Sequence, residues 1–230
     1  MTLLGRVCVS GCGDRRGVLK PLAWEYDGAV KSEEFYAQAY RNPEFARVYR
    51  EKRAELYRRI GEIIRSLGAS YALDIGCSMG LLVEYLHQQG ISSWGADFDL
   101  PELRASHGGL SCSGNFFYGD AADLRILVPP EGSAIILLDT LRYMEVPERL
   151  AGLGAESLII KEVTPMMGPW RKDENDARLY APAGLARLFS SYRMERIYSS
   201  RFLFSVSRPS SVTLAAFGLM PTYTAVMVRR

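Results

Sequence analysis

The sequence predicts an α/β fold because short apolar strands alternate with helical segments around a glycine-containing turn. Residues 71–75, Tyr-Ala-Leu-Asp-Ile, have the apolar pattern of a buried parallel strand, and glycines punctuate the turn at residues 76–80. Apolar residues then recur at helical spacing until Gly90 ends the run. Residues 91–97 form a second predicted strand, which ends in Asp97. This order is typical of α/β proteins that bind a small molecule at the ends of their strands.

The glycine turn and Asp97 together indicate a ligand that contains a ribose. Gly76 and Gly80 allow the backbone to pass close to a ligand, and the following helix offers free N–H groups at its N-terminus. Asp97 lies about 20 residues beyond the turn, where dinucleotide-binding folds place the carboxylate that binds ribose hydroxyls. The turn lacks the G-x-G-x-x-G arrangement that fits a pyrophosphate. A ligand with a ribose but without a phosphate is therefore expected.

Three motifs in order resemble those of a known enzyme superfamily. They are Leu-Asp-Ile-Gly-Cys-Ser-Met-Gly at 73–80, Gly-Ala-Asp-Phe-Asp at 95–99 and Tyr-Gly-Asp-Ala-Ala-Asp-Leu at 118–124. The chain is thereby similar to class I S-adenosylmethionine-dependent methyltransferases, in particular to small-molecule and methionine-biosynthesis-type members. The resemblance implies a Rossmann-like, seven-stranded, mostly parallel sheet with helices on both faces and an antiparallel last strand. It covers about residues 43–230, the expected methyltransferase domain, and leaves residues 1–42 as an N-terminal extension and helical cap.

The remaining strands of this fold can be assigned along the chain. Residues 133–141 resemble the fourth strand, 158–165 the fifth, and 176–185 the segment before the last helix. Residues 197–206 and 222–228 are predicted to be the last two strands, paired as a hairpin at the sheet edge. The motifs would then gather beyond the carboxyl ends of the strands, where such folds bind their ligands.

A long helix is predicted over residues 43–67. Asn42 is a good N-cap, a proline occupies the first helical position, and Gly68 can end the helix. Apolar residues form a stripe at three- and four-residue spacing, whereas the many arginines are interleaved with Glu51 and Glu55. We interpret these arginines as a solvated face with local ion pairs, in preference to a surface that binds RNA or phosphate.

The resemblance also implies how the cofactor S-adenosylmethionine (SAM) would be held. Asp74 and the glycine turn would surround its methionine part, and Asp97 would bind its ribose hydroxyls. Asp120 would bind the adenine amino group, while Asp139 and Thr140 would offer backbone carbonyls to the amino group of the cofactor. The complete set of implied cofactor-binding residues is Asp74, Gly76, Cys77, Ser78, Gly80, Asp97, Phe98, Asp120, Ala121, Asp139 and Thr140.

The methyl acceptor is less defined, because a sulfonium methyl group is already activated and the enzyme mainly orients the acceptor and excludes water. Candidate catalytic residues after the fourth and fifth strands are Arg142, Tyr143 and Glu162. Arg142 and Tyr143 stand where related quinone-type methyltransferases have Glu and His, so their acid–base chemistry is not carried over. We expect in-line transfer to a small molecule. The alternatives are RNA or protein methylation and a catalytically silent SAM-binding subunit that acts through a protein partner.

A rival interpretation is a hydrolase, because residues 76–80 also match the G-x-S-x-G nucleophile elbow. The chain has two histidines that could activate Ser78. His87 lies on the following helix and would point away, and His107 precedes the third strand and is expected at the surface. Cys77 has no basic neighbour in sequence and is expected to be a small loop residue. The hydrolase interpretation is therefore disfavoured.

The composition is that of an ordinary globular domain, with 48% hydrophobic and 23% charged residues. A net charge of +2 is too small to indicate a nucleic-acid binder. No apolar run approaches the roughly 18 residues that span a bilayer, and the first residues lack a signal-peptide core, so a cytoplasmic location is predicted. The four cysteines are expected to be free thiols. Cys8 and Cys12 lack the second ligand pair of a zinc site, so no metal is expected.

Overall fold

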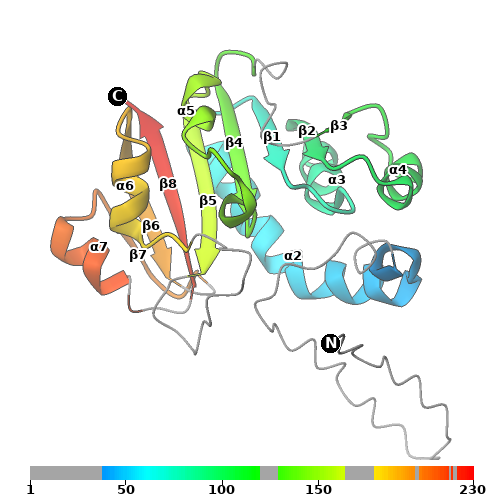
Figure 1. Ribbon diagram of the computed structural model, residues 1–230, viewed down its shortest axis with the longest axis horizontal. Coiled ribbons are helices and arrows are strands. Elements are labelled where there is room, and N and C mark those ends of the chain that lie inside the picture. The colour runs from blue at the N-terminus through cyan, green and yellow to red at the C-terminus, as the bar shows by residue number, and fades with distance from the viewer. Residues whose placement is uncertain (1–37, 120–128, 164–178, 200–201, 218, 220–221) are drawn as a thin grey trace, which may run out of the picture.

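The computed structural model describes residues 38–119, 129–163, 179–199, 202–217, 219 and 222–230 (Figure 1). Within these residues, eight strands form one sheet in the order β3-β2-β1-β4-β5-β8-β6-β7. The strands are β1 Tyr71–Ile75, β2 Ser92–Asp97, β3 Phe116–Tyr118, β4 Ser133–Leu138, β5 Ser157–Val163, β6 Tyr192–Ser199, β7 Ser205–Ser207 and β8 Thr222–Arg229. The helices are α2 Pro43–Ser66, α3 Leu81–Gln88, α4 Pro101–Gly108, α5 Arg149–Gly152, α6 Pro182–Leu188, α7 Ser211–Phe217 and the short 3-10 helix η2 Leu141–Tyr143.

The first five strands are parallel, and β8 runs antiparallel between β5 and β6. The central strand β4, Ser-Ala-Ile-Ile-Leu-Leu, is buried along its whole length, as expected for a parallel strand that is covered on both faces. The carboxyl ends of the parallel strands meet at one edge of the sheet. The predicted α/β fold with a mostly parallel sheet and an antiparallel last strand is confirmed.

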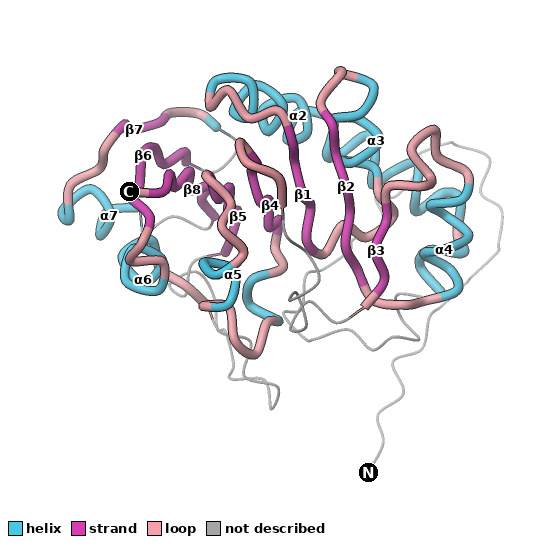
Figure 2. The backbone as a smooth tube through the Cα atoms, turned by 90° about the horizontal axis from the view of Figure 1, so that it is seen from above, coloured by secondary structure: helices cyan, strands magenta, loops and turns pink. Residues whose placement is uncertain are grey.

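Helices cover both faces of the sheet (Figure 2). On one face, Ile60 of α2 and Leu82 of α3 belong to the same core cluster as Ile136 of β4. On the other face, Ile135 of β4 shares a cluster with Leu185 of α6 and with side chains of α5 and α7. Successive side chains of a strand point to opposite faces, so β4 contributes to both layers of the core.

The C-terminal strands differ from the prediction in number and order. The segment 197–206, predicted as one strand, spans the end of β6 and the start of β7, so the sheet has eight strands within the described residues instead of seven. Phe202 has a left-handed φ of +56°, which the apolar run around it does not reveal. The last strand, β8, is not at the edge. It lies between β5 and β6 and is buried from Tyr223 to Met227.

The predicted long helix is α2, and its start and end are as expected. The Asn42 side chain accepts a hydrogen bond from the Glu44 N–H at 3.0 Å, and Gly68 has a φ of +69° just beyond the last turn. On the outer face, Arg58 pairs with Glu55 and Glu62 through exposed side chains. In the part of the chain that the structure describes, no helix is long and apolar enough to cross a bilayer.

Candidate active site

The glycine turn between β1 and α3 is held tightly against its neighbours. Gly76 and Gly80 have φ values of +77° and +74°, in the left-handed region that glycine adopts without strain. A Cβ atom at Gly76 would collide with the side chain of Thr140, and one at Gly80 would lie 2.7 Å from the ring of Phe116. Only glycine therefore fits at these two places, where the turn meets Thr140 after β4 and Phe116 of β3.

Asp97 at the end of β2 is hydrogen-bonded to the glycine turn. One carboxylate oxygen accepts a hydrogen bond from the Ser78 N–H at 2.5 Å, and the other accepts one from the Phe98 N–H at 2.7 Å. Burial raises the pKa of Asp97, and these two N–H groups act in the opposite direction. Each oxygen still has a second lone pair. The half-buried carboxylate can therefore accept further hydrogen bonds, for example from hydroxyl groups.

Asp74 lies within β1, directly before the turn, and its side chain is buried. Its exposed fraction is 4%. Burial raises the pKa of Asp74 to about 7, and nearby Asp97 adds to this effect while Arg53 opposes it. The group is thus partly protonated near neutral pH. A protonated carboxyl can donate a hydrogen bond as well as accept one.

Asp139, directly after β4, gathers three positively charged side chains. Lys161 Nζ lies 2.7 and 2.8 Å from its two carboxylate oxygens. The guanidinium groups of Arg142 and Arg53 approach it to 3.3 and 3.4 Å. Burial would raise the pKa of Asp139, but these cations hold it below its ordinary value. This cluster joins β4, β5, η2 and α2 at the strand-end edge.

Arg53 corrects the view that the arginines of α2 lie on its solvated face. Its guanidinium stacks over the ring of Tyr49 at 4.5 Å and points toward Asp139. The signal was available in the sequence, because residue 53 fills the place in the apolar stripe between Tyr49 and Leu56. By contrast, Arg47 is exposed and forms the expected ion pairs within the helix.

No protein-family model and no curated protein sequence matches the chain, but many solved structures are similar to it. An S-adenosylmethionine-dependent methyltransferase from Clostridium acetobutylicum aligns with a TM-score of 0.61 and 12% identity, over 81% of this chain and 98% of that chain. The magnesium protoporphyrin IX methyltransferase from Synechocystis, with bound SAM, aligns with a TM-score of 0.53 and 16% identity, over 89% and 100%. The protein has the methyltransferase fold.

A third similar structure comes from a complex between the Haloferax volcanii Trm112 methyltransferase activator and a methyltransferase. It aligns with a TM-score of 0.62 and 14% identity, over 87% of this chain and 99% of that chain. At these identities the likeness concerns the fold. The resemblance expected from the three sequence motifs is confirmed at that level.

Two of the predicted catalytic residues are buried in the methyltransferase fold. Glu162 has an exposed fraction of 0% and Arg142 one of 4%, and Arg142 Nε lies 3.4 Å from Glu162 Oε2. Among the described residues, neither carboxylate oxygen of Glu162 accepts a hydrogen bond of good geometry, although the backbone N–H of Leu141 helps to lower its pKa. Burial raises the pKa of Glu162 to about 7, although Arg142 opposes the shift. Tyr143, the third candidate, is 39% exposed at the end of η2.

The other predicted residues divide into three groups. Phe98 is exposed after β2, and Thr140 lies beside Gly76. Cys77 and Cys112 are both buried and free. Burial raises the pKa of the Cys77 thiol, whereas a nucleophilic cysteine needs a lowered pKa. Several predictions lie outside the described residues, namely Asp120, Ala121, Cys8 and Cys12.

His107 is buried, which corrects the expectation that it lies at the surface. Its Nε2 lies 2.7 Å from the Ser78 backbone oxygen and its Nδ1 lies 2.9 Å from the Tyr118 hydroxyl. The Ser78 hydroxyl instead donates to the hydroxyl of Tyr40 at 2.9 Å. The imidazole therefore faces the backbone of Ser78 and not its hydroxyl. The nucleophile–base pair that a hydrolase requires is not formed by these residues.

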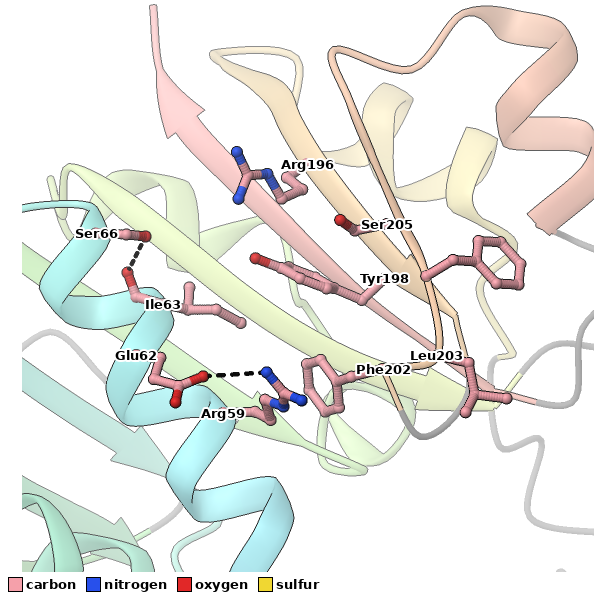
Figure 3. Close-up of a pocket in the computed structure, with 10 residues that line it drawn as sticks. Arg59, Glu62, Ile63, Ser66, Arg196, Tyr198, Phe202, Leu203 and Ser205 are labelled. Carbon is pink, nitrogen blue, oxygen red and sulfur yellow. Dashed lines mark hydrogen bonds and ion pairs between the residues drawn. The ribbon is translucent and has the colours of Figure 1, made fainter.

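A pocket also lies between α2 and residues 202–205, beside the end of β6 (Figure 3). Ile63, Tyr198 and Phe202 form part of its lining, and Arg59 pairs with Glu62 at its rim. None of the predicted cofactor-binding or catalytic residues lines this pocket. It is therefore distinct from the candidate active site.

Proposed function

We propose that this protein is a SAM-dependent methyltransferase that acts on a small-molecule acceptor. The observation that carries the proposal is the half-buried carboxylate of Asp97, which ends β2 and binds the glycine turn through the Ser78 N–H. In α/β folds of this kind, a carboxylate at the end of the second strand binds ribose hydroxyls. The lack of a pyrophosphate fingerprint favours a nucleoside cofactor such as SAM over a dinucleotide.

The groups at this edge suit such a cofactor. Asp97 retains lone pairs for ribose hydroxyls, and Asp74 can accept or donate hydrogen bonds beside the methionine part. Two backbone carbonyls were candidates to bind the amino group of the cofactor. That of Thr140 already accepts a hydrogen bond from the Tyr143 N–H at 3.0 Å. The carbonyl of Asp139 is therefore the better candidate.

When bound, SAM supplies a methyl group that is activated by a positively charged sulfur and is ready for in-line displacement by an acceptor. The protein has to orient the acceptor and exclude water. Tyr143 is exposed at the end of η2 and can contact an acceptor, so it is our first candidate for a catalytic residue. Arg142 and Glu162 are buried and would act indirectly. Arg142 connects η2 to Asp139 after β4 and to Glu162 of β5, and so fixes the position of η2.

The charge distribution supports a small acceptor over RNA. The exposed Arg47 and Arg58 of α2 are each paired with glutamates of the same helix, which reduces the positive charge that they offer to a phosphate backbone. We propose residues 43–230 as the methyltransferase domain and residues 1–42 as its extension. The second candidate function is a silent SAM-binding subunit that acts through a partner. It is supported by the similar structure that was solved as a complex with an activator protein.

Calorimetric titration tests the proposal, with SAM, S-adenosylhomocysteine (SAH) and NAD as ligands. We expect micromolar binding of SAM and SAH and no binding of NAD. Asp97→Ala should weaken SAH binding by about 1–3 kcal/mol, because a charge-assisted pair of ribose hydrogen bonds is lost. Asp99→Ala is the matched control. Within the part of the chain that the structure describes, its exposed carboxylate pairs with Arg104, and affinity should not change.

Each outcome has a clear meaning. Failure of the wild-type protein to bind SAM or SAH would overturn the proposal. Equal affinity in Asp97→Ala and the wild type would remove Asp97 from the site. A protein that binds SAM but transfers no methyl group to any compound in an acceptor screen would favour the silent subunit.

A further inference from the structure

Ser78 is a strained residue of the glycine turn. Its φ is +51°, in the left-handed region, where a residue other than glycine costs roughly 1–2 kcal/mol. Its N–H donates to Asp97 of β2 at 2.5 Å, and its hydroxyl donates to Tyr40 at 2.9 Å. Its carbonyl oxygen accepts a hydrogen bond from His107 at 2.7 Å. Three separate parts of the chain thus hold one strained residue in place.

The contact from His107 has a defined chemical form. A carbonyl oxygen can only accept, so His107 Nε2 carries a hydrogen, and in the neutral ring Nδ1 then accepts from the Tyr118 hydroxyl at 2.9 Å. The ring is 1% exposed and stacks on Phe116 with centroids 3.8 Å apart and planes 11° apart. Both hydrogen bonds and the stacking agree on one orientation of the imidazole.

The same aromatic ring connects His107 to the rest of the turn. The ring of Phe116 lies 2.7 Å from the position that a Cβ atom of Gly80 would occupy, so the turn packs against this ring. The imidazole of His107 stacks on the same ring and contacts the turn at Ser78. His107 itself belongs to the last turn of α4. The backbone of Ser78 is consequently contacted at both its N–H and its carbonyl oxygen, which together restrict its φ and ψ.

We infer that His107 is a positioning residue, which holds the glycine turn in its cofactor-binding conformation through the carbonyl oxygen of Ser78. The inference rests on the proposed function and adds a residue that none of the three motifs contains. A turn that is already ordered spares the cofactor the free-energy cost of ordering it. Loss of the His107 contact would leave a strained residue free to relax, and binding of the cofactor would have to restore its conformation.

The decisive comparison is between His107→Gln and His107→Asn in titrations with SAH. Glutamine can present an amide N–H near the place of Nε2 and reach the Ser78 carbonyl, whereas asparagine reaches only the place of Nδ1. Both variants lose the stacked ring, so their packing losses are similar. We expect His107→Asn to bind SAH about tenfold more weakly than the wild type and His107→Gln to stay within about threefold.

Two further variants control for folding. His87→Asn changes the exposed histidine of α3 and should leave affinity unchanged. His107→Phe keeps an aromatic ring against Phe116 but loses both hydrogen bonds, and it replaces His107→Asn if that variant does not fold. We expect it also to bind SAH about tenfold more weakly. The unfolding temperature of each ligand-free variant is measured in parallel.

The two proposals fail in different ways. If the wild type does not bind SAH, the proposed function and this inference both fall. If the wild type binds and the glutamine and asparagine variants have equal affinity, only this inference is overturned. Lower unfolding temperatures of both variants without a difference in affinity would show that His107 has a structural role alone.

Discussion

The two sides of the candidate site satisfy their carboxylates in different ways. At the ends of β1 and β2, Asp97 is bound by backbone N–H groups of the turn and of the next residue. At the ends of β4 and β5, Asp139 and Glu162 are approached by charged side chains instead. Backbone partners are supplied by the path of the chain, whereas charged partners depend on distant residues. The first arrangement is thus robust to most side-chain changes, and the second is not.

Within the second region, the two carboxylates are affected in opposite directions. Three cations hold the pKa of Asp139 below its ordinary value, whereas burial raises the pKa of Glu162 to about 7. Arg142 contacts both groups, at 3.3 and 3.4 Å. This one guanidinium therefore bridges the two carboxylates, although Lys161 is the nearer partner of Asp139.

The largest effect on stability is expected when the guanidinium of Arg142 is removed. Arg142→Met should lower the free energy of unfolding by about 3–5 kcal/mol, because a buried charge pair that loses one partner leaves the other charge uncompensated. Urea unfolding at pH 8, above the pKa of about 7 that Glu162 has in the wild type, measures the loss. Arg187→Met, on the exposed face of α6, is the control and should change stability by less than about 0.5 kcal/mol.

A second replacement distinguishes charge from packing in this region. In Arg142→Met/Glu162→Met both charges are gone, and apolar pairs often replace buried ion pairs without loss of stability. The double variant should therefore recover most of the stability lost in Arg142→Met. A double variant that is as unstable as the single one would mean that shape, and not charge, decides the cost.

On the side of the site that depends on backbone hydrogen bonds, a single added methyl group should be strongly destabilising. Gly80→Ala should cost about 2–4 kcal/mol of stability, because left-handed strain adds to a collision with the ring of Phe116. Gly90→Ala is the matched control, since Gly90 has a similar φ of +76° but nothing within 4 Å of the added atom. It should cost only about 1 kcal/mol. Equal costs for both would contradict the role of Phe116.

The same contrast explains what could be predicted from sequence. The start of α2 at Asn42, strand β1 and the turn around Gly76 and Gly80 depend on neighbouring residues, and each was predicted correctly in the part that the structure describes. The place of β8 between β5 and β6 depends on long-range pairing, which a local pattern does not encode. The turn at Phe202 was missed because its residues are as apolar as those of a strand.

Side-chain roles followed the same division. Burial of His107 depends on Phe116 and Tyr118, which the sequence alone did not connect with α4. The contact of Arg142 with Glu162 joins η2 to β5 across the fold. Periodicity identifies which face of a helix is apolar, but a charged residue within that face, such as Arg53, requires knowledge of its distant partner.

The smallest expected effect concerns pH. Asp74 has a pKa of about 7 in the folded protein and an ordinary value of 3.8, so folding favours its protonated form. This contribution to stability is complete below pH 4 and is lost as pH rises through about 7. Glu162, whose pKa is raised from 4.5 to about 7, and Asp97, whose pKa burial also raises, act in the same direction. His107, whose pKa is lowered by burial, acts in the opposite direction below pH 6.5.

Asp74→Asn should therefore flatten the pH dependence of stability without abolishing it. Between pH 5 and pH 8 the wild type should lose about 1–3 kcal/mol more than the variant, because asparagine has no proton to release. Urea unfolding at several pH values measures both slopes. Asp99→Asn is the control, since Arg104 lowers the pKa of Asp99 and the group stays ionised throughout this range. A wild-type slope that Asp74→Asn leaves unchanged would assign the titration to Glu162 or Asp97, the two other carboxyl groups whose pKa values burial raises.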